Sequence, residues 1–452
     1  MFKFAKVALF QIVWVAAAQS QAQGLTDFYQ QALLHNPDYR IAEYERLASE
    51  ELYKQARSSM LPQASLTYVD THSRQDIVSS DNAVFGSGRT NFPAKDLTVS
   101  VSQSLFNYEA MMKIKQSKFQ IAMIDADFQA ARQDLILNVA DAYFAVVALL
   151  VDKKAVDAEE ASVAQHYELV QAKQQGGLVR DLDVMDARAR YYQVQARRVE
   201  IEASLQDALQ AMRQLGGHLP DSIRTIAGNM PLVSPDPVSV EDWLDTAYQY
   251  NPEIEAANKA VEAADMEIRV QRGGHMPTLD FFIDYNDNET SGTLFGGGSH
   301  VKTRQVGLQV SLPIFSGGVV SSRVRESASR RSQALLRQEQ ARRSVHRDVQ
   351  ASYRNILSDK ARVEALEISE ASNASVVESR NTAFSSGLVT GLAVLDAERD
   401  LFLASTDLSR ARISFLINSL RLKRSVGLLS LEDLIEIDSL LQAEGISVES
   451  YL

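Results

Sequence analysis

Cysteine is absent from this chain of 452 residues. A chain without cysteine forms no disulfide and no thiolate metal site, and it offers no thiol for a lipid after a leader peptide. Basic residues are outnumbered by acidic ones, 46 to 58, which leaves a formal net charge of -12. Nucleic-acid binding requires clustered Lys and Arg, so this acidic composition argues against a nucleic-acid partner.

Proline is scarce and unevenly placed. None of the ten prolines lies between Pro93 and Pro220, and none follows Pro313. Because proline stops or kinks a helix, these spans are free to form very long helices. Asn107–Gln175 and Phe315–Ser385 would each be roughly 100 Å long at 1.5 Å per residue. Helices of this length require a coiled coil or a similar packed assembly.

Long hydrophobic runs are also missing. No stretch of 18 apolar residues occurs beyond the N-terminus, so no transmembrane helix is expected. Residues 1–22 have a basic start, a short apolar run at Val7–Ala18 and a small-x-small site at Ser20-Gln21-Ala22. This pattern is typical of a secretory signal peptide, and the mature chain is expected to start near Gln23.

The sequence contains an internal repeat. At a shift of 215 positions, Asn36-Pro37 matches Asn251-Pro252, and Phe28 matches Trp243. At a shift of 210, Gly177-Leu178-Val179 matches Gly387-Leu388-Val389 and Asp186-Ala187 matches Asp396-Ala397. A period this long exceeds a solenoid unit and indicates a fold built from two similar halves.

Each half contains a predicted helical hairpin. The glycines at 176, 177 and 387 can take a positive φ and so end a helix. Further helical patterns follow at Asp183–Leu215 and Ala393–Val426. Within the first long helix, apolar residues recur at spacings of 3 and 4, which marks one helical face.

Four segments alternate with a period of two, as strands do. Asp96–Phe106 and Gln305–Phe315 are the clearest, Leu279–Asn286 is similar, and Ala64–Tyr68 is shorter. One face is apolar and the other carries Ser, Thr, Gln or Asp. Such strands fit a soluble sheet on a core, or a membrane barrel with a polar interior.

The barrel interpretation suits an exported chain better. Four strands cannot close a barrel, so several copies would each have to donate four. The connections at Thr71–Lys95 and Asn286–Thr303 are rich in Gly, Asn, Ser and Asp, and they are expected to be long loops outside the membrane.

The doubled order of helix, two strands, long helix, glycine turn and helix resembles the TolC family of outer-membrane efflux and secretion ducts. The resemblance covers nearly all of the mature chain. It depends on the two Asn-Pro pairs, on Val310–Gly318 (VSLPIFSGG), and on the turns Gly177-Leu178-Val179 and Gly387-Leu388-Val389-Thr390.

The resemblance implies a mainly α fold with a membrane β-barrel portion and a duplicated α-β-β-α-α repeat. Three chains would form a twelve-stranded barrel continued by a coiled-coil tunnel through the periplasm. The expected divisions are a signal peptide at 1–22, a first repeat at 23–219, a linker at 220–240, a second repeat at 241–427 and a tail at 428–452. Linker and tail would form a belt around the tunnel.

The resemblance further implies an export function without catalysis or cofactor. The partners would be a periplasmic adaptor, an inner-membrane ABC or proton-driven transporter, and outer-membrane lipid. Cargo could be a protein, in type I secretion, or small drugs, in multidrug efflux. The expected docking tips comprise Gly177, Leu178, Val179, Gly387, Leu388 and Val389.

Carboxylates are expected to narrow the closed tunnel. The family often has two acidic residues after the second turn, but the first of these positions is Ala393 here and only Asp396 remains. The first repeat instead carries Asp181, Asp183 and Asp186, and we assign Asp183, Asp186 and Asp396 to the constriction. A ring of these carboxylates would attract cations, although acidic residues are also common where helices begin.

Two other function classes fit less well. An enzyme is disfavoured because the seven histidines show no metal-ligand spacing, and neither a nucleophile-elbow nor a phosphate-loop motif is present. A soluble periplasmic coiled-coil adaptor or adhesin would account for the helices. It would not account for four strands with one polar face.

Overall fold

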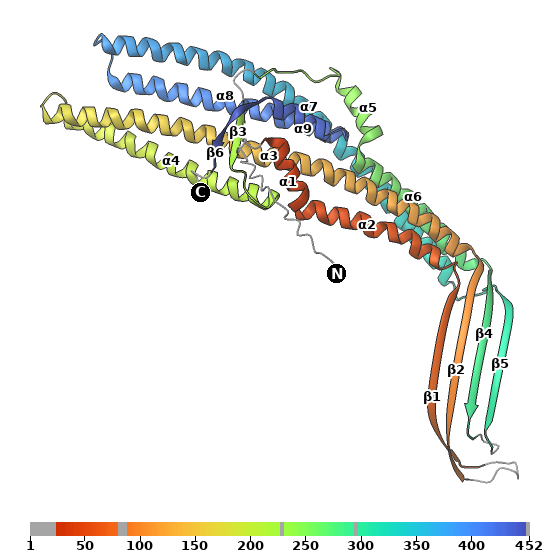
Figure 1. Cartoon of the computed structure of the whole chain (residues 1–452). Coiled ribbons are helices and arrows are strands. Elements are labelled where there is room, and N and C mark those ends of the chain that lie inside the picture. The colour runs from red at the N-terminus through yellow and green to blue at the C-terminus, as the bar shows by residue number, and fades with distance from the viewer. Residues whose placement is uncertain (1–23, 80–87, 227–229, 293–296, 449–452) are drawn as a thin grey trace, which may run out of the picture. The chain divides into compact units, whose positions relative to one another are not determined.

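A computed structural model describes residues 24–79, 88–226, 230–292 and 297–448 (Figure 1). The predicted signal peptide lies outside the described residues. The first series of elements is α1 (Leu25–His35), α2 (Pro37–Ser58), β1 (Gln63–Ile77), β2 (Gly88–Asn107), α3 (Tyr108–Gln175) and α4 (Asp181–Gly216). The linking strand is β3 (Ser222–Ile226).

The second series repeats this order. It comprises α5 (Val240–Tyr250), α6 (Pro252–Arg272), a short 3-10 helix η1 (Gly273–His275), β4 (Thr278–Thr290), β5 (Ser299–Ser311), α7 (Val319–Ser385) and α8 (Gly391–Val426). The tail forms α9 (Leu431–Ser439) and β6 (Leu441–Ser447). The mainly helical fold and the two long helices are therefore confirmed, with α3 spanning 68 residues and α7 spanning 67.

The repeated Asn-Pro pairs divide the opening helix of each half in two. Pro37 and Pro252 each begin a helix, where the missing N–H is not needed. The Asn36 carboxamide oxygen accepts a hydrogen bond from the N–H of Tyr39 at 2.9 Å. The Asn251 oxygen accepts from Glu253 at 2.9 Å and from Ile254 at 3.2 Å. Each Asn thus caps the helix that its proline starts.

The chain divides into two compact units. The first comprises Met1–Arg40, Ala131–Gln249 and His346–Leu452, and the second comprises Ile41–Ala130 and Tyr250–Val345. Each long helix contributes one part to each unit.

The second unit contains a four-stranded antiparallel sheet in the order β1-β2-β4-β5. Its register places like side chains together on each face. One row across the sheet is Ala64, Val101, Ile283 and Val306, and the next row along is Ser65, Ser100, Asp284 and Gln305. One face is thus apolar over its middle, and the other is lined with Ser, Thr, Asp, Asn and Gln.

The predicted long loops were wrong. β1 extends to Ile77 and β2 begins at Gly88, so most of Thr71–Lys95 is strand, and β4 and β5 together take up most of Asn286–Thr303. The alternation fades there because the apolar face becomes charged. Beyond its apolar middle this face carries Asp70 and Lys95 on β1 and β2, and Asp287 and Lys302 on β4 and β5.

The first unit joins the linker to the tail. β3 pairs with β6 in an antiparallel two-stranded sheet. The buried hydroxyl of Tyr143 on α3 donates to the carbonyl of Arg224 at 3.1 Å and accepts from its N–H at 2.9 Å. The Asp438 carboxylate accepts from the N–H of Leu25 at 2.6 Å, which ties α9 to the start of α1.

One described helix, α3, is long and apolar enough to cross a membrane by length and composition, contrary to the expectation from the sequence. Half of its most apolar window is buried within the chain. Ile136, Val139, Ala140, Phe144 and Val147 are all at most 1% exposed. This burial is typical of a core helix.

The two faces of the sheet predict opposite responses to charge. Arg at Val99, Val101, Leu308 or Val310 should block membrane assembly, because these residues lie on the apolar face, where a lipid-facing Arg at the midplane costs about 2–4 kcal/mol per chain. Arg at Ser100 or Gln309, on the polar face, should be tolerated. Membrane fractionation of the variants is the measurement. Equal damage from both sets would show that the apolar face does not meet lipid.

Candidate functional site

The two glycine turns have the same backbone geometry. Gly177 and Gly387 adopt φ values of 74° and 73°. The N–H of Leu178 donates to the carbonyl of Lys173, and that of Leu388 donates to Ala383, both at 2.9 Å. Both turns are therefore Schellman motifs, in which a residue with positive φ satisfies the last carbonyls of a helix.

The turns present apolar side chains to solvent. Leu178 is 76% exposed and Leu388 is 79% exposed. The following helices then begin differently: Thr390 caps α8 by accepting from the N–H of Ala393 at 3.3 Å, whereas α4 uses Asp183. Gly177, Leu178, Val179, Gly387, Leu388 and Val389 thus lie at the ends of two helical hairpins, as the repeat predicts.

Asp183 has a structural role in the described chain. Its carboxylate accepts from the backbone N–H of Arg180 at 3.0 Å and from the Arg180 guanidinium at 3.2 Å. These hydrogen bonds lower the pKa of Asp183 below its ordinary value. The contact satisfies an unpaired backbone donor at the start of α4.

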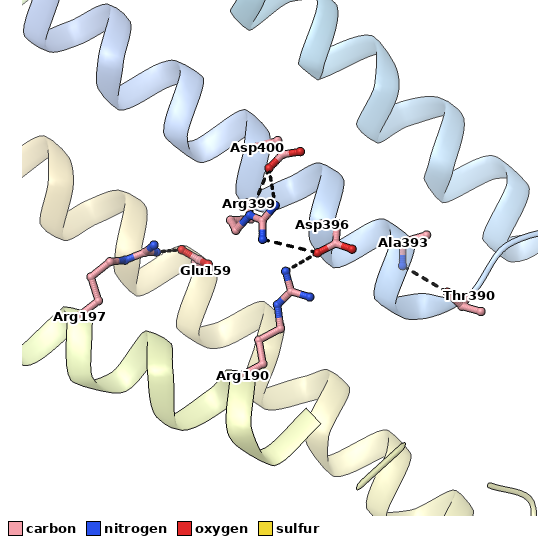
Figure 2. A network of polar contacts seen from close by, with 8 residues as sticks. All are labelled: Glu159, Arg190, Arg197, Thr390, Ala393, Asp396, Arg399 and Asp400. Carbon is pink, nitrogen blue, oxygen red and sulfur yellow. Dashed lines mark hydrogen bonds and ion pairs between the residues drawn. The ribbon is translucent and has the colours of Figure 1, made fainter. Parts of the chain in front are cut away.

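Asp396 is held between arginines (Figure 2). Its carboxylate forms an ion pair with Arg190, which reaches across from α4 to α8, and lies 3.7 Å from Arg399. Arg399 also pairs with Asp400 at 2.8 Å. About two turns further along α4, Arg197 pairs with Glu159 of α3 (Figure 2). Within one chain these arginines compensate much of the carboxylate charge.

Asp186 is exposed and lines a surface groove with Arg190, Arg197 and Arg399. The structure therefore places Asp186 and Asp396 near the same arginines, whereas Asp183 lies at the helix cap. The sequence analysis missed Arg190 and Arg399. The internal repeat could have drawn attention to Arg190, because at the shift of 210 this basic residue is equivalent to the acidic Asp400.

Apolar contacts hold the three helices together beneath these ion pairs. Val156 and Val163 of α3, Val194 of α4 and Leu395 of α8 form a buried cluster. Ser162 on α3 donates to the Glu398 carboxylate on α8 at 2.5 Å. No group of three acidic or histidine side chains suited to a metal occurs in the part of the chain that the structure describes.

His166 packs against the first residue of α8. A Cβ at Gly391 would lie 2.9 Å from Cε1 of the imidazole, so only glycine allows this approach. Burial, followed by the charges of Arg190 and Lys173, lowers the pKa of His166. A protonated ring would add a third positive charge beside the positive end of a helix.

We therefore expect acid to loosen the start of α8. The ordinary His pKa is about 6.5, so the stabilisation by neutral His166 is complete above that pH and is lost as pH falls through the lower folded pKa. Amide hydrogen exchange at 391–395, corrected for intrinsic rates, should rise between about pH 7.5 and pH 5.5. His166→Gln should abolish the rise, while His72→Gln should preserve it; an unchanged pH response in His166→Gln would contradict this assignment.

Comparisons with known proteins agree with this architecture. Residues 28–218 and 243–428 match the family model described as outer membrane efflux protein. The chain is 30% identical to the outer membrane protein TolC of Escherichia coli K12, over 93% of this chain and 86% of TolC. It is 26% identical to the alkaline protease secretion protein AprF of Pseudomonas aeruginosa, over 91% of this chain and 86% of AprF.

The fold is also similar to solved structures. The Campylobacter jejuni CmeC outer membrane channel superposes with a TM-score of 0.77 at 16% identity, over 97% of both chains. The open state of the Neisseria gonorrhoeae MtrE outer membrane channel gives a TM-score of 0.72 at 20% identity, over 90% of this chain and 89% of MtrE. The two family-model segments coincide with the two halves of the repeat, and this chain belongs to the outer membrane efflux protein family.

Proposed function

We propose that the chain is the outer-membrane exit duct of an export system and works as a homotrimer. The observation that carries the proposal is the four-stranded sheet with one apolar and one polar face, attached to long helices. The apolar face suits lipid and the polar face suits a water-filled interior. The alternative function, a soluble adaptor or adhesin, does not account for a sheet with one apolar and one polar face.

The sheet supports assembly because its edges are open. In the described sheet β1 and β5 each pair on one side only. The helices next to them, α2 before β1 and α7 after β5, leave apolar side chains uncovered, with Ile41 56%, Tyr44 58% and Leu336 71% exposed. Three copies joined edge to edge would give twelve strands and cover these side chains.

This assembly is tested by native mass after detergent extraction of the membrane fraction. We expect three copies, and Leu336→Glu should weaken the trimer because a charge would be buried at the join. Leu178→Glu, at an exposed turn, is the matched control. A monomer from the membrane fraction, or equal loss in both variants, would contradict the proposed assembly.

We further propose that the duct receives substrate from an inner-membrane transporter through a periplasmic adaptor that binds the turns. Leu178 and Leu388 support this, because they are exposed apolar residues at matched hairpin ends. The test is to express the chain in a strain that lacks its own duct and to measure whether export is restored. Assaying protein cargo and small-molecule cargo separately distinguishes the two cargo classes.

The tips should crosslink to the adaptor. Cysteine at Leu178 or Leu388 in the cysteine-free chain should form disulfides with cysteines placed along the adaptor hairpin, because these turns would be the contact. Cysteine at Tyr192, exposed on α4 three to four turns from its start, should react little. Crosslinking at Tyr192 equal to that at the turns would place the contact elsewhere.

The carboxylates Asp183, Asp186 and Asp396 are proposed to line the narrow end of the duct. Their arginine partners make Arg190→Gln informative, because the change leaves the Asp396 charge without its partner on α4. In a planar bilayer this variant should increase conductance and cation preference, and Asp186→Asn with Asp396→Asn should reduce cation preference. Arg188→Gln, whose guanidinium lies over the Tyr192 ring, is the control. Selectivity unchanged in every variant would show that these carboxylates act only in helix structure.

A further inference from the structure

Two segments of the first unit contain acidic residues and no basic ones. Residues 225–249 hold four carboxylates, and residues 425–452 hold six, with no Lys or Arg in either. These ten charges approach the formal net charge of the whole chain, which is -12. The remainder of the chain is close to neutral, so its acidity is concentrated in the linker, α5 and the tail.

The two acidic segments meet at an apolar groove. Its volume is about 250 Å³, and its walls come from the linker and from α5, α7, α8 and α9 (these four helices are labelled in Figure 1). Trp243, Phe415, Leu416, Leu420 and Ile437 form its floor and are at most 8% exposed. Val233 of the linker also lines the groove and is 68% exposed. An open apolar groove with a few polar groups at its margin is a common form of binding site.

The margin of the groove is negative. Asp236 and Glu436 line it and are exposed. Asp433 also lines it and pairs with Lys423, the one basic residue among the lining side chains. Lys360 lies nearby and donates to the Ser234 hydroxyl at 2.7 Å, which fastens the linker to α7. The surrounding field therefore attracts a basic ligand.

We propose that this groove docks a basic segment of a partner protein, which inserts an apolar side chain over Trp243 and Phe415 and places Lys or Arg beside Asp236 and Glu436. The acidic charge is spread over two segments, in the linker, α5 and the tail. A small cation would contact only a small part of this surface, whereas a peptide segment would cover more of it. An anionic lipid or an acidic peptide would be repelled. The contact is separate from the turns that would bind the adaptor, so it adds a second docking surface to the proposed duct.

Tryptophan fluorescence tests the proposal directly. The chain has two tryptophans, and the other one, Trp14, lies in the predicted signal peptide. The probe is a synthetic peptide of alternating Lys-Lys and Leu-Leu pairs, titrated against the full-length protein in a zwitterionic detergent. We expect a saturable change in Trp243 emission that weakens about tenfold between low and physiological salt, because the attraction between exposed charges is screened. The same peptide with Glu for Lys should give no saturable change.

Matched variants distinguish binding in the groove from attraction by the negative charge of the whole surface. Asp236→Asn with Glu436→Gln should weaken binding at least about fivefold, because these carboxylates would face the ligand. Asp245→Asn with Glu432→Gln removes the same number of charges from the same segments outside the groove and should change affinity less than about twofold. Ser419→Leu should also weaken binding by filling the groove without a change of charge.

Circular dichroism and native mass establish that each variant is folded before its affinity is compared. Equal effects of the two double variants would overturn the proposal, since the field alone would then hold the peptide. Unchanged affinity in folded Ser419→Leu, or equal binding of the Glu peptide, would overturn it as well. None of these readouts depends on trimer formation or on export, so failure here leaves the proposed duct function intact.

Discussion

The need to pair every backbone N–H and C=O in lipid constrains the whole molecule. Water is absent from the bilayer core, so an open sheet edge there would leave a row of unsatisfied groups. Within the described sheet, β1 and β5 each have one such edge. In the proposed assembly, a chain with four strands would obtain its missing partners from other copies. The duplication provides two similar β-hairpins, which join within the chain through β2 and β4 and would join between chains through β1 and β5 in the proposed assembly.

A second constraint comes from the length of the helices. Long helices can shift along one another, and ion pairs between α3 and α8 add to their buried apolar contacts in fixing the alignment. Arg410, Arg421 and Arg424 of α8 pair with Asp152, Asp141 and Asp134 of α3, in antiparallel order. The pairs of Arg421 and Arg424 are partly exposed, and an exposed pair contributes only about 0–1 kcal/mol, so these two contribute more to register than to stability. Asp152 is buried, so its carboxylate depends on Arg410 for a partner. The ion pair between Arg190 and Asp396 likewise links α4 to α8.

These constraints explain what could be predicted from the sequence. The absence of proline left both spans free to form long helices, and the glycine turns at Gly177 and Gly387 indicated where those helices end. Alternation identified the strands only where one face was apolar, so it failed beyond Tyr68, where Asp70, His72 and Arg74 continue that face. The pairing of β3 with β6 could not be predicted, because it joins residues more than 200 positions apart. Arg190 was missed for a similar reason, because it lies 206 positions from Asp396 along the chain.

The distribution of charge separates two kinds of surface on the first unit. Around Asp396 and Glu159, the carboxylates are paired with Arg190, Arg197 and Arg399, so much of their charge is compensated within the chain. A partner at the turns would then be recognised mainly through shape and through the exposed leucines. The linker and tail are less fully compensated: Asp433 pairs with Lys423 and Asp438 lies 3.8 Å from Arg224, but residues 225–249 and 425–452 contain ten carboxylates and no Lys or Arg. Uncompensated charge acts over a Debye length of about 8 Å at physiological salt, so this surface would select and orient a basic partner before contact.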